Sequence, residues 1–164
     1  MVESERDTAA VTRLLGVDHA CAASDLRRML SRELPASGTR QENFTPTEVL
    51  LCLAAMYLID FTRYGSQTAQ TAPSPVPQLA ALARRPPSSI LAKMANLAGA
   101  RSHGGQGETK AASKWLADDG DSLMRSYRIV LATARELGVD EVALPDFLPV
   151  RPVVIGGRLP EVTS

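Results

Sequence analysis

The apolar run at residues 49–59, VLLCLAAMYLI, constrains the fold most, because a helix built from it is apolar nearly all round. It follows Thr45, Pro46 and Glu48, which are typical of a threonine cap, a first-turn proline and a glutamate that reaches back to the cap. The pattern predicts a long helix from Thr45 to about Tyr64. Since this helix has no face for solvent, we expect it to be central and the other elements to pack around it.

Apolar residues recur at helical spacing on both sides of this run. They predict helices at residues 4–16, 18–34, 77–84, 88–97, 109–117 and 121–137. In the second of these helices, Ser24 and Asp25 are expected to act as restart caps, and Arg27, Arg28 and Arg32 to face solvent. Trp115 is expected to anchor the core, and Asp121 to cap the last helix. Only 4% of the 164 residues are aromatic, so the core must consist of Leu, Ala, Val, Ile and Met. We therefore expect a compact all-α, multi-helix domain over residues 1–138.

Residues 139–164 have a different composition, with prolines at 145, 149, 152 and 160 and a Gly156–Gly157 pair. This pattern predicts an irregular, Pro-rich C-terminal tail or linker, because proline and glycine interrupt regular structure. Such a tail either straps the domain or leads to a further one.

The middle of the chain resembles a helix-turn-helix element. Arg85, two prolines and two serines separate two short amphipathic segments, and proline ends the first helix while suiting the start of the second. After the second segment comes a polar loop with Arg101, Ser102, His103, Gly104, Gly105 and Gln106. A loop of hydrogen-bond donors on a flexible backbone suits phosphates or base edges.

Charge is distributed unevenly although the net charge is zero. Residues 61–115 carry seven Lys and Arg against Glu108 alone, whereas the segments on either side are each net negative. This asymmetry predicts a positive face for a polyanion, against the alternative that the charges only solvate helix surfaces.

Catalytic and metal-binding motifs are not found in the sequence. It lacks GxxxxGK[ST], GxSxG and HExxH, and has only two histidines. We interpret Asp118, Asp119 and Asp121 as helix caps and turn residues, in preference to a cation site. We expect the thiols of Cys21 and Cys52 to be buried and to stay reduced in the cytoplasm. We expect a cytoplasmic binding protein that is not an enzyme, with no cofactor, no metal and no membrane segment.

The segment from Arg85 to Asn96 matches R-x-P-x-S-[IV]-x-x-K-[ML]-x-N. With EVLLCLAAMYL upstream and a WL-containing helix downstream, residues 44–137 resemble the sulfur-binding domain of McrA-like HNH restriction endonucleases. The resemblance implies recognition of phosphorothioate-modified double-stranded DNA. The HNH module is missing, so the chain would be the recognition part alone.

Carried over by motif, the resemblance implies a sulfur pocket formed by Val76, Pro77 and Ala80, with Arg101 and Ser102 on the opposite wall. His103, Gly104, Gly105 and Gln106, together with Arg40 and Gln41 on a separate loop, are the candidates for base or backbone contacts. An apolar cup favours sulfur, because sulfur is more polarisable and less strongly hydrated than oxygen.

Two other functions remain open from the sequence. An ordinary helix-turn-helix regulator would place residues 88–97 in the major groove of unmodified DNA, with a homodimer reading two half-sites. A helical adaptor would use its apolar surface for another protein and show no salt-dependent affinity for DNA.

Overall fold

The computed structural model describes residues 5–33, 42–65, 67–99, 106–118 and 120–148. Within these ranges the chain is helical and has no strand, which confirms the predicted all-α fold for the described part. The elements are α1 (Glu5–Leu15), α2 (His19–Ser31), α3 (Pro46–Ala55), the 3-10 helices η1 (Phe61–Arg63) and η2 (Ala69–Thr71), α4 (Val76–Ala83), α5 (Pro87–Leu97), α6 (Gln106–Leu116) and α7 (Asp121–Glu136). None of the helices in these ranges is long and apolar enough to cross a membrane.

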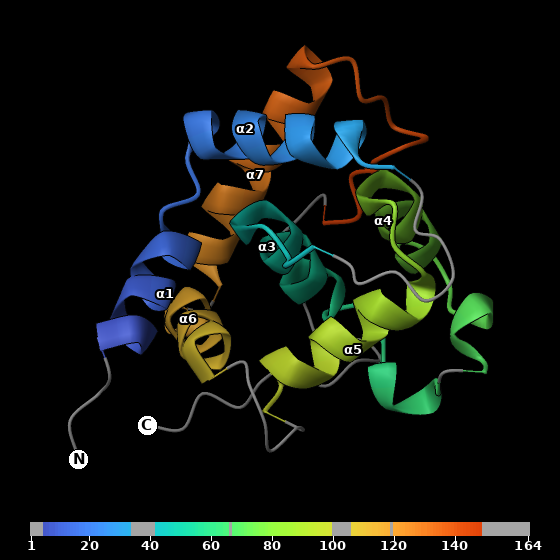
Figure 1. The fold of residues 1–164 in the computed structure, drawn as a ribbon, viewed down its shortest axis with the longest axis horizontal. Helices are drawn as coiled ribbons and strands as arrows, with labels where there is room; N and C mark the ends of the chain where they lie inside the picture. The colour runs from blue at the N-terminus through green and yellow to red at the C-terminus, as the bar shows by residue number, and fades with distance from the viewer. Residues whose placement is uncertain (1–4, 34–41, 66, 100–105, 119, 149–164) are drawn as a thin grey trace.

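Helix α3 lies at the centre of the molecule (Figure 1). All of its residues are buried, and it contacts α1, α2, α4, α5 and α7. The predicted cap is present: the Thr45 hydroxyl accepts from the Glu48 N–H, and the Glu48 carboxylate accepts from the Thr45 N–H at 2.9 Å. The sequence prediction of a central, fully buried helix is confirmed.

The prediction that this helix continues to Tyr64 is wrong, because α3 ends at Ala55. Turns follow, and the Asp60 carboxylate then accepts from the Thr62 N–H and caps η1. An acidic side chain that accepts from a backbone N–H two residues ahead favours a new helical start at that point over continuation of an earlier helix. Met56 and Ile59 stay buried, so the apolar run still belongs to the core.

Helix α2 is continuous, so the predicted restart at Ser24 and Asp25 does not occur. Its cap is Asp18, whose carboxylate accepts from the Cys21 N–H at 2.8 Å. The Asp25 carboxylate instead accepts from the Thr47 N–H at 3.0 Å and ties α2 to the first turn of α3.

Helices α6 and α7 complete the bundle, α6 against α1 and α7 against α2. Trp115 is fully buried, as predicted. The predicted cap of α7 is wrong: the Asp118 carboxylate, not Asp121, accepts from the Ser122 N–H at 3.1 Å, and Gly120 precedes the helix with φ 82°. At the other end, Gly138 follows α7 with φ 83°, as the sequence predicts for a helix terminator.

Residues 139–148 run back along α7 as a strap. Leu144 and Leu148 are buried. The Tyr127 hydroxyl donates to the Asp146 carboxylate at 2.8 Å, and Arg135 donates to the Leu144 carbonyl at 2.9 Å. The described part of the predicted tail is therefore bound to the helical domain, and residues 149–164 lie outside the described residues.

Candidate functional site

The predicted sulfur-pocket residues on α4 divide into exposed and buried positions. Pro77 is exposed in the first turn of α4, whereas Val76 and Ala80 are almost fully buried. The alternation follows from helical spacing, because α4 turns one face to the core and the other to solvent. Of the three, only Pro77 offers a surface to a ligand; the other two support it from below.

Pro77 lines an open groove of about 510 Å³. The groove lies between α4, the end of α2 and the strap, and its remaining lining residues are Leu30, Gln78, Ala81, Leu82, Arg84, Val142 and Ala143. Its walls are mostly apolar, and two of its residues, Leu30 (39% exposed) and Val142 (84% exposed), are among the few large hydrophobic side chains that face solvent in the described ranges. A concave apolar surface with one cationic side chain is suited to binding.

The predicted opposite wall of the pocket falls outside the part of the chain that the structure describes. Arg101, Ser102, His103, Gly104 and Gly105 lie outside the described residues, and so do Arg40 and Gln41. Gln106 is the first residue of α6, but its side chain is not described. These contacts remain sequence predictions.

A sharp corner joins α4 to α5 and sets the far end of the groove. Arg84 adopts left-handed backbone angles, φ 54° and ψ 47°. The Arg84 N–H donates to the Ala81 carbonyl at 3.2 Å and the Arg85 N–H to the Ala80 carbonyl at 2.9 Å, the paired bonds of a Schellman motif. The corner turns Arg85 back into the core while Arg84 stays beside the groove.

Arg85 contributes little to the predicted positive face, which is a correction to the charge argument. Its Nε lies 2.7 Å from Glu48 Oε2, and its other nitrogens donate to the carbonyls of Glu42 and Asn43. Its guanidinium also lies 3.9 Å from the centre of the Phe44 ring. Four partners from the α2–α3 connection and α3 thus hold this arginine inside the fold.

Lys93 and Arg32 are likewise committed to internal contacts. Lys93 Nζ lies 2.8 Å from Glu108 Oε2. Arg32, predicted to face solvent, is only 8% exposed, and it bonds both Glu48 oxygens, at 2.7 and 2.8 Å. It is buried because the Glu48 carboxylate, capping α3, requires cationic partners in the core.

The pKa of Glu48 is lowered although burial acts in the opposite direction. Desolvation alone would raise this pKa, but hydrogen bonds from Arg32, Arg85 and the Thr45 N–H stabilise the carboxylate more strongly. Glu48 is therefore a charged structural centre. Its role as a cap was readable from the sequence; its two arginine partners were not, since they come from distant segments.

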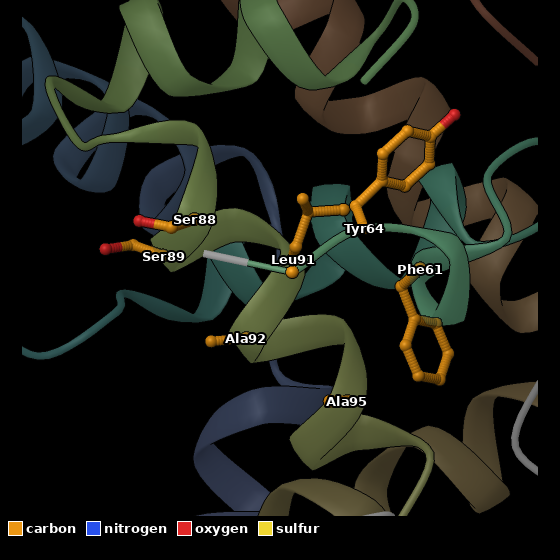
Figure 2. Close-up of a pocket in the computed structure, with 8 residues that line it drawn as sticks. Phe61, Tyr64, Ser88, Ser89, Leu91, Ala92 and Ala95 are labelled. Carbon is orange, nitrogen blue, oxygen red and sulfur yellow. The ribbon is translucent and has the colours of Figure 1, made fainter. Parts of the chain in front are cut away.

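A second hollow, of about 390 Å³, was missed by the sequence reasoning (Figure 2). It lies where η1 meets α5 and is lined by Phe61, Tyr64, Gly65, Ser88, Ser89, Leu91, Ala92 and Ala95. In Figure 2 the Ser88 and Ser89 side chains point away from the two aromatic rings. The polar and aromatic groups therefore do not converge on one ligand position.

Neither cysteine is poised for nucleophilic chemistry. Burial and the neighbouring Asp25 raise the pKa of the half-buried Cys21 to about 11, and burial raises the pKa of Cys52 as well. The thiolate form, which is the nucleophile, is therefore scarce at both positions. Among the described residues, no group of three or more His, Cys, Asp or Glu side chains is placed to hold a metal ion.

Comparisons with known proteins found no relative of this chain. No protein-family model, no curated protein and no solved structure matches the chain.

Proposed function

We propose that this chain is a binding module for double-stranded DNA that carries a phosphorothioate linkage. The observation that carries the proposal is the exposed Pro77 ring at the edge of an apolar groove, at the position where the resemblance to sulfur-binding domains expects it. A sulfur atom against Pro77 loses little hydration and gains carbon contacts, whereas a phosphate oxygen there loses strong hydrogen bonds to water.

The buried residues under Pro77 support this role. Val76 and Ala80 are packed into the core, so the first turn of α4 is held by tertiary contacts and not by a side-chain cap. A ligand surface on a rigid helix discriminates better between atoms of similar size than a surface on a loop, because it cannot relax around the larger or more hydrated atom. In this proposal Arg101 and Ser102, which follow α5 in the sequence, form the opposite wall of the sulfur pocket, as the resemblance implies.

The helix-turn-helix regulator is the alternative, with α5 as the recognition helix. The partly exposed positions of α5 include Ser88, Ser89, Ala92, Ala95 and, near its C-terminal end, Asn96, and its lysine, Lys93, is paired with Glu108. Base reading in the major groove usually depends on Arg, Lys, Asn or Gln at such positions. Of these residue types, α5 presents only the paired Lys93 and Asn96, so it has few side chains for reading bases.

A binding titration at controlled salt tests the proposal. Two duplexes of one sequence, differing only in a single stereodefined sulfur within a G-containing core, are titrated with the full chain. We expect tighter binding to the sulfur duplex. Equal affinity for both would overturn the proposal in favour of the regulator, and no binding to either across several core sequences would favour the adaptor.

Pro77→Glu locates the pocket within the same assay. A carboxylate in the cup repels the phosphate and abolishes the sulfur preference. Gln70→Glu is the matched control, because it adds the same charge at an exposed position of η2, away from the groove. If Pro77→Glu kept the wild-type ratio of the two affinities, the sulfur pocket would lie elsewhere.

A further inference from the structure

Arg84 occupies a backbone position that is unfavourable for an arginine. Among the described residues it is the one non-glycine residue with positive φ. Left-handed angles bring Cβ close to the backbone, so glycine is the usual residue at this point of a Schellman motif. The fold needs the left-handed turn, since it returns Arg85 to Glu48, but it does not need a side chain on the turning residue.

The Arg84 side chain also has no partner within the described part of the chain. No hydrogen bond or ion pair of its guanidinium is found there, whereas the next residue, Arg85, is fully engaged. Arg84 instead lines the groove that contains Pro77. An unpaired cation held at a conformational cost beside an apolar groove points to a ligand outside the chain.

Pro77 and Arg84 lie at opposite ends of α4, Pro77 in its first turn and Arg84 directly after its last residue. Both line the groove, and Ala81 lines it between them. At a rise of about 1.5 Å per residue, Pro77 and Arg84 are roughly 10 Å apart along the helix. An arginine side chain can therefore reach a phosphate near the one that lies against Pro77.

We propose that Arg84 is a DNA-backbone contact and that the groove follows one strand from Pro77 to Arg84. This inference rests on the proposed function and extends it. Arginine suits the role because its guanidinium binds phosphate oxygens through two parallel hydrogen bonds. The contact does not distinguish sulfur from oxygen at Pro77, so it supplies affinity and register, not selectivity.

Acidic residues on the strap determine along which edge of the groove the DNA strand runs. Glu141 is exposed beside Val142, and its carboxylate repels a phosphate. The Asp140 carboxylate accepts from the Val142 and Ala143 N–H groups, both at 3.0 Å, which partly offsets its charge. The strand therefore runs along the α4 edge, and Glu141→Gln should tighten binding.

Arg84→Gly tests the proposal, because glycine is the residue that the backbone prefers there. The thermal midpoint of the variant should not fall. Affinity for both the sulfur duplex and its all-oxygen counterpart should weaken about tenfold, as expected for one charge-assisted contact. The slope of log affinity against log salt, measured from about 50 to about 200 mM, should become shallower by about one.

Two further variants separate charge from backbone effects. Arg84→Lys should restore most of the lost affinity, whereas Arg84→Asn, which tolerates left-handed angles, should bind as weakly as Arg84→Gly. Arg125→Gln on α7 is the control for removing a well-exposed arginine elsewhere, and it should leave the affinity unchanged.

The outcomes distinguish this inference from the function on which it rests. If the wild-type chain prefers the sulfur duplex and Arg84→Gly binds both duplexes as the wild type does, the Arg84 contact is wrong and the proposed function stands. If the wild-type chain binds neither duplex, both fail. A change in sedimentation of Arg84→Gly without a change in DNA affinity would assign the groove to protein contact and overturn the inference.

Discussion

Arg85 and Glu48 form a buried ion pair, with Arg85 Nε 2.7 Å from Glu48 Oε2 and both side chains at most 3% exposed. Glu48 also bonds Arg32, so one carboxylate links the end of α2, the start of α3 and the α4–α5 corner. The α4–α5 corner lies at one end of the groove. Arg84, the residue before Arg85, lines the groove and has no partner among the described residues. Two adjacent arginines therefore have opposite roles in the fold.

Replacing Arg85 should destabilise the protein strongly. Arg85→Met leaves the Glu48 carboxylate with one cationic partner in a buried environment, and breaking a buried pair costs about 3 kcal/mol. Urea unfolding measures the loss. Arg84→Gly is the control at the neighbouring position, and we expect no loss in its free energy of unfolding. If Arg85→Met were as stable as the wild type, the Arg85–Glu48 pair would contribute nothing to stability.

Stability should fall in acid through Glu48. Its pKa is lowered in the folded state, so the unfolded chain takes up this proton at a higher pH than the folded chain. The stabilisation from the ionised Glu48 carboxylate is fully present above the pKa of Glu48 in the unfolded chain, about 4.3. It is lost as the pH falls through the lower pKa of Glu48 in the folded protein. Urea unfolding from about pH 6 to about pH 3 should therefore show a steeper loss for the wild type than for Glu48→Gln. Parallel curves would contradict the assignment.

The strap should loosen when the Tyr127 hydroxyl is removed. This hydroxyl donates to Asp146 and accepts from the Leu148 N–H at 3.2 Å, so Tyr127→Phe leaves a buried N–H without its partner. We expect a loss of about 1–2 kcal/mol in stability and faster hydrogen exchange across residues 139–148. Tyr64→Phe is the control, because no hydrogen bond of the Tyr64 hydroxyl is found among the described residues. Unchanged exchange in Tyr127→Phe would mean that apolar contacts alone hold the strap.

Two glycines with nearly the same positive φ should respond differently to alanine. Gly120 has φ 82°, and a Cβ there would meet the Tyr57 hydroxyl at 2.9 Å; Gly138 has φ 83° and nothing within 4 Å. Gly138→Ala should cost about 1 kcal/mol from the backbone alone, and Gly120→Ala about 2 kcal/mol because Tyr57 must also move. Thermal unfolding compares them, and equal losses would refute the steric component.

The sequence predicted the elements whose signals are local. The capping box at Thr45, the apolar run after it and the glycine that follows α7 each depend on neighbouring residues, and all three are present. The end of α3 was mispredicted because apolarity continues through residues 56–59 while the helix does not. The Asp60 cap that starts η1 is a weak signal beside so apolar a run.

The long-range contacts were not readable from the sequence. Arg32 has the spacing of a solvent-facing residue, and only the fold shows that it reaches Glu48, sixteen positions away. The charge argument failed at Arg85 and Lys93 for the same reason, since counting charges along a segment does not reveal which are neutralised by another. Pro77 was predicted as a site residue by resemblance alone and stays a prediction, whereas the groove beside it depends on Leu30 and Val142, from segments that no local pattern connects to α4.

Arg101 and Arg84 should act independently in DNA binding. Arg101 lies outside the described residues and is assigned to the cup by resemblance, and Arg84 is assigned to the strand beyond it. Each single variant, Arg101→Ala or Arg84→Gly, removes one phosphate contact and should make the salt slope shallower by about one. Contacts to separate phosphates share no partner, so their effects should add within about 0.5 kcal/mol in the double variant. A salt slope in the double variant no shallower than in either single one would mean that both arginines bind the same phosphate, and the strand would then end at the cup.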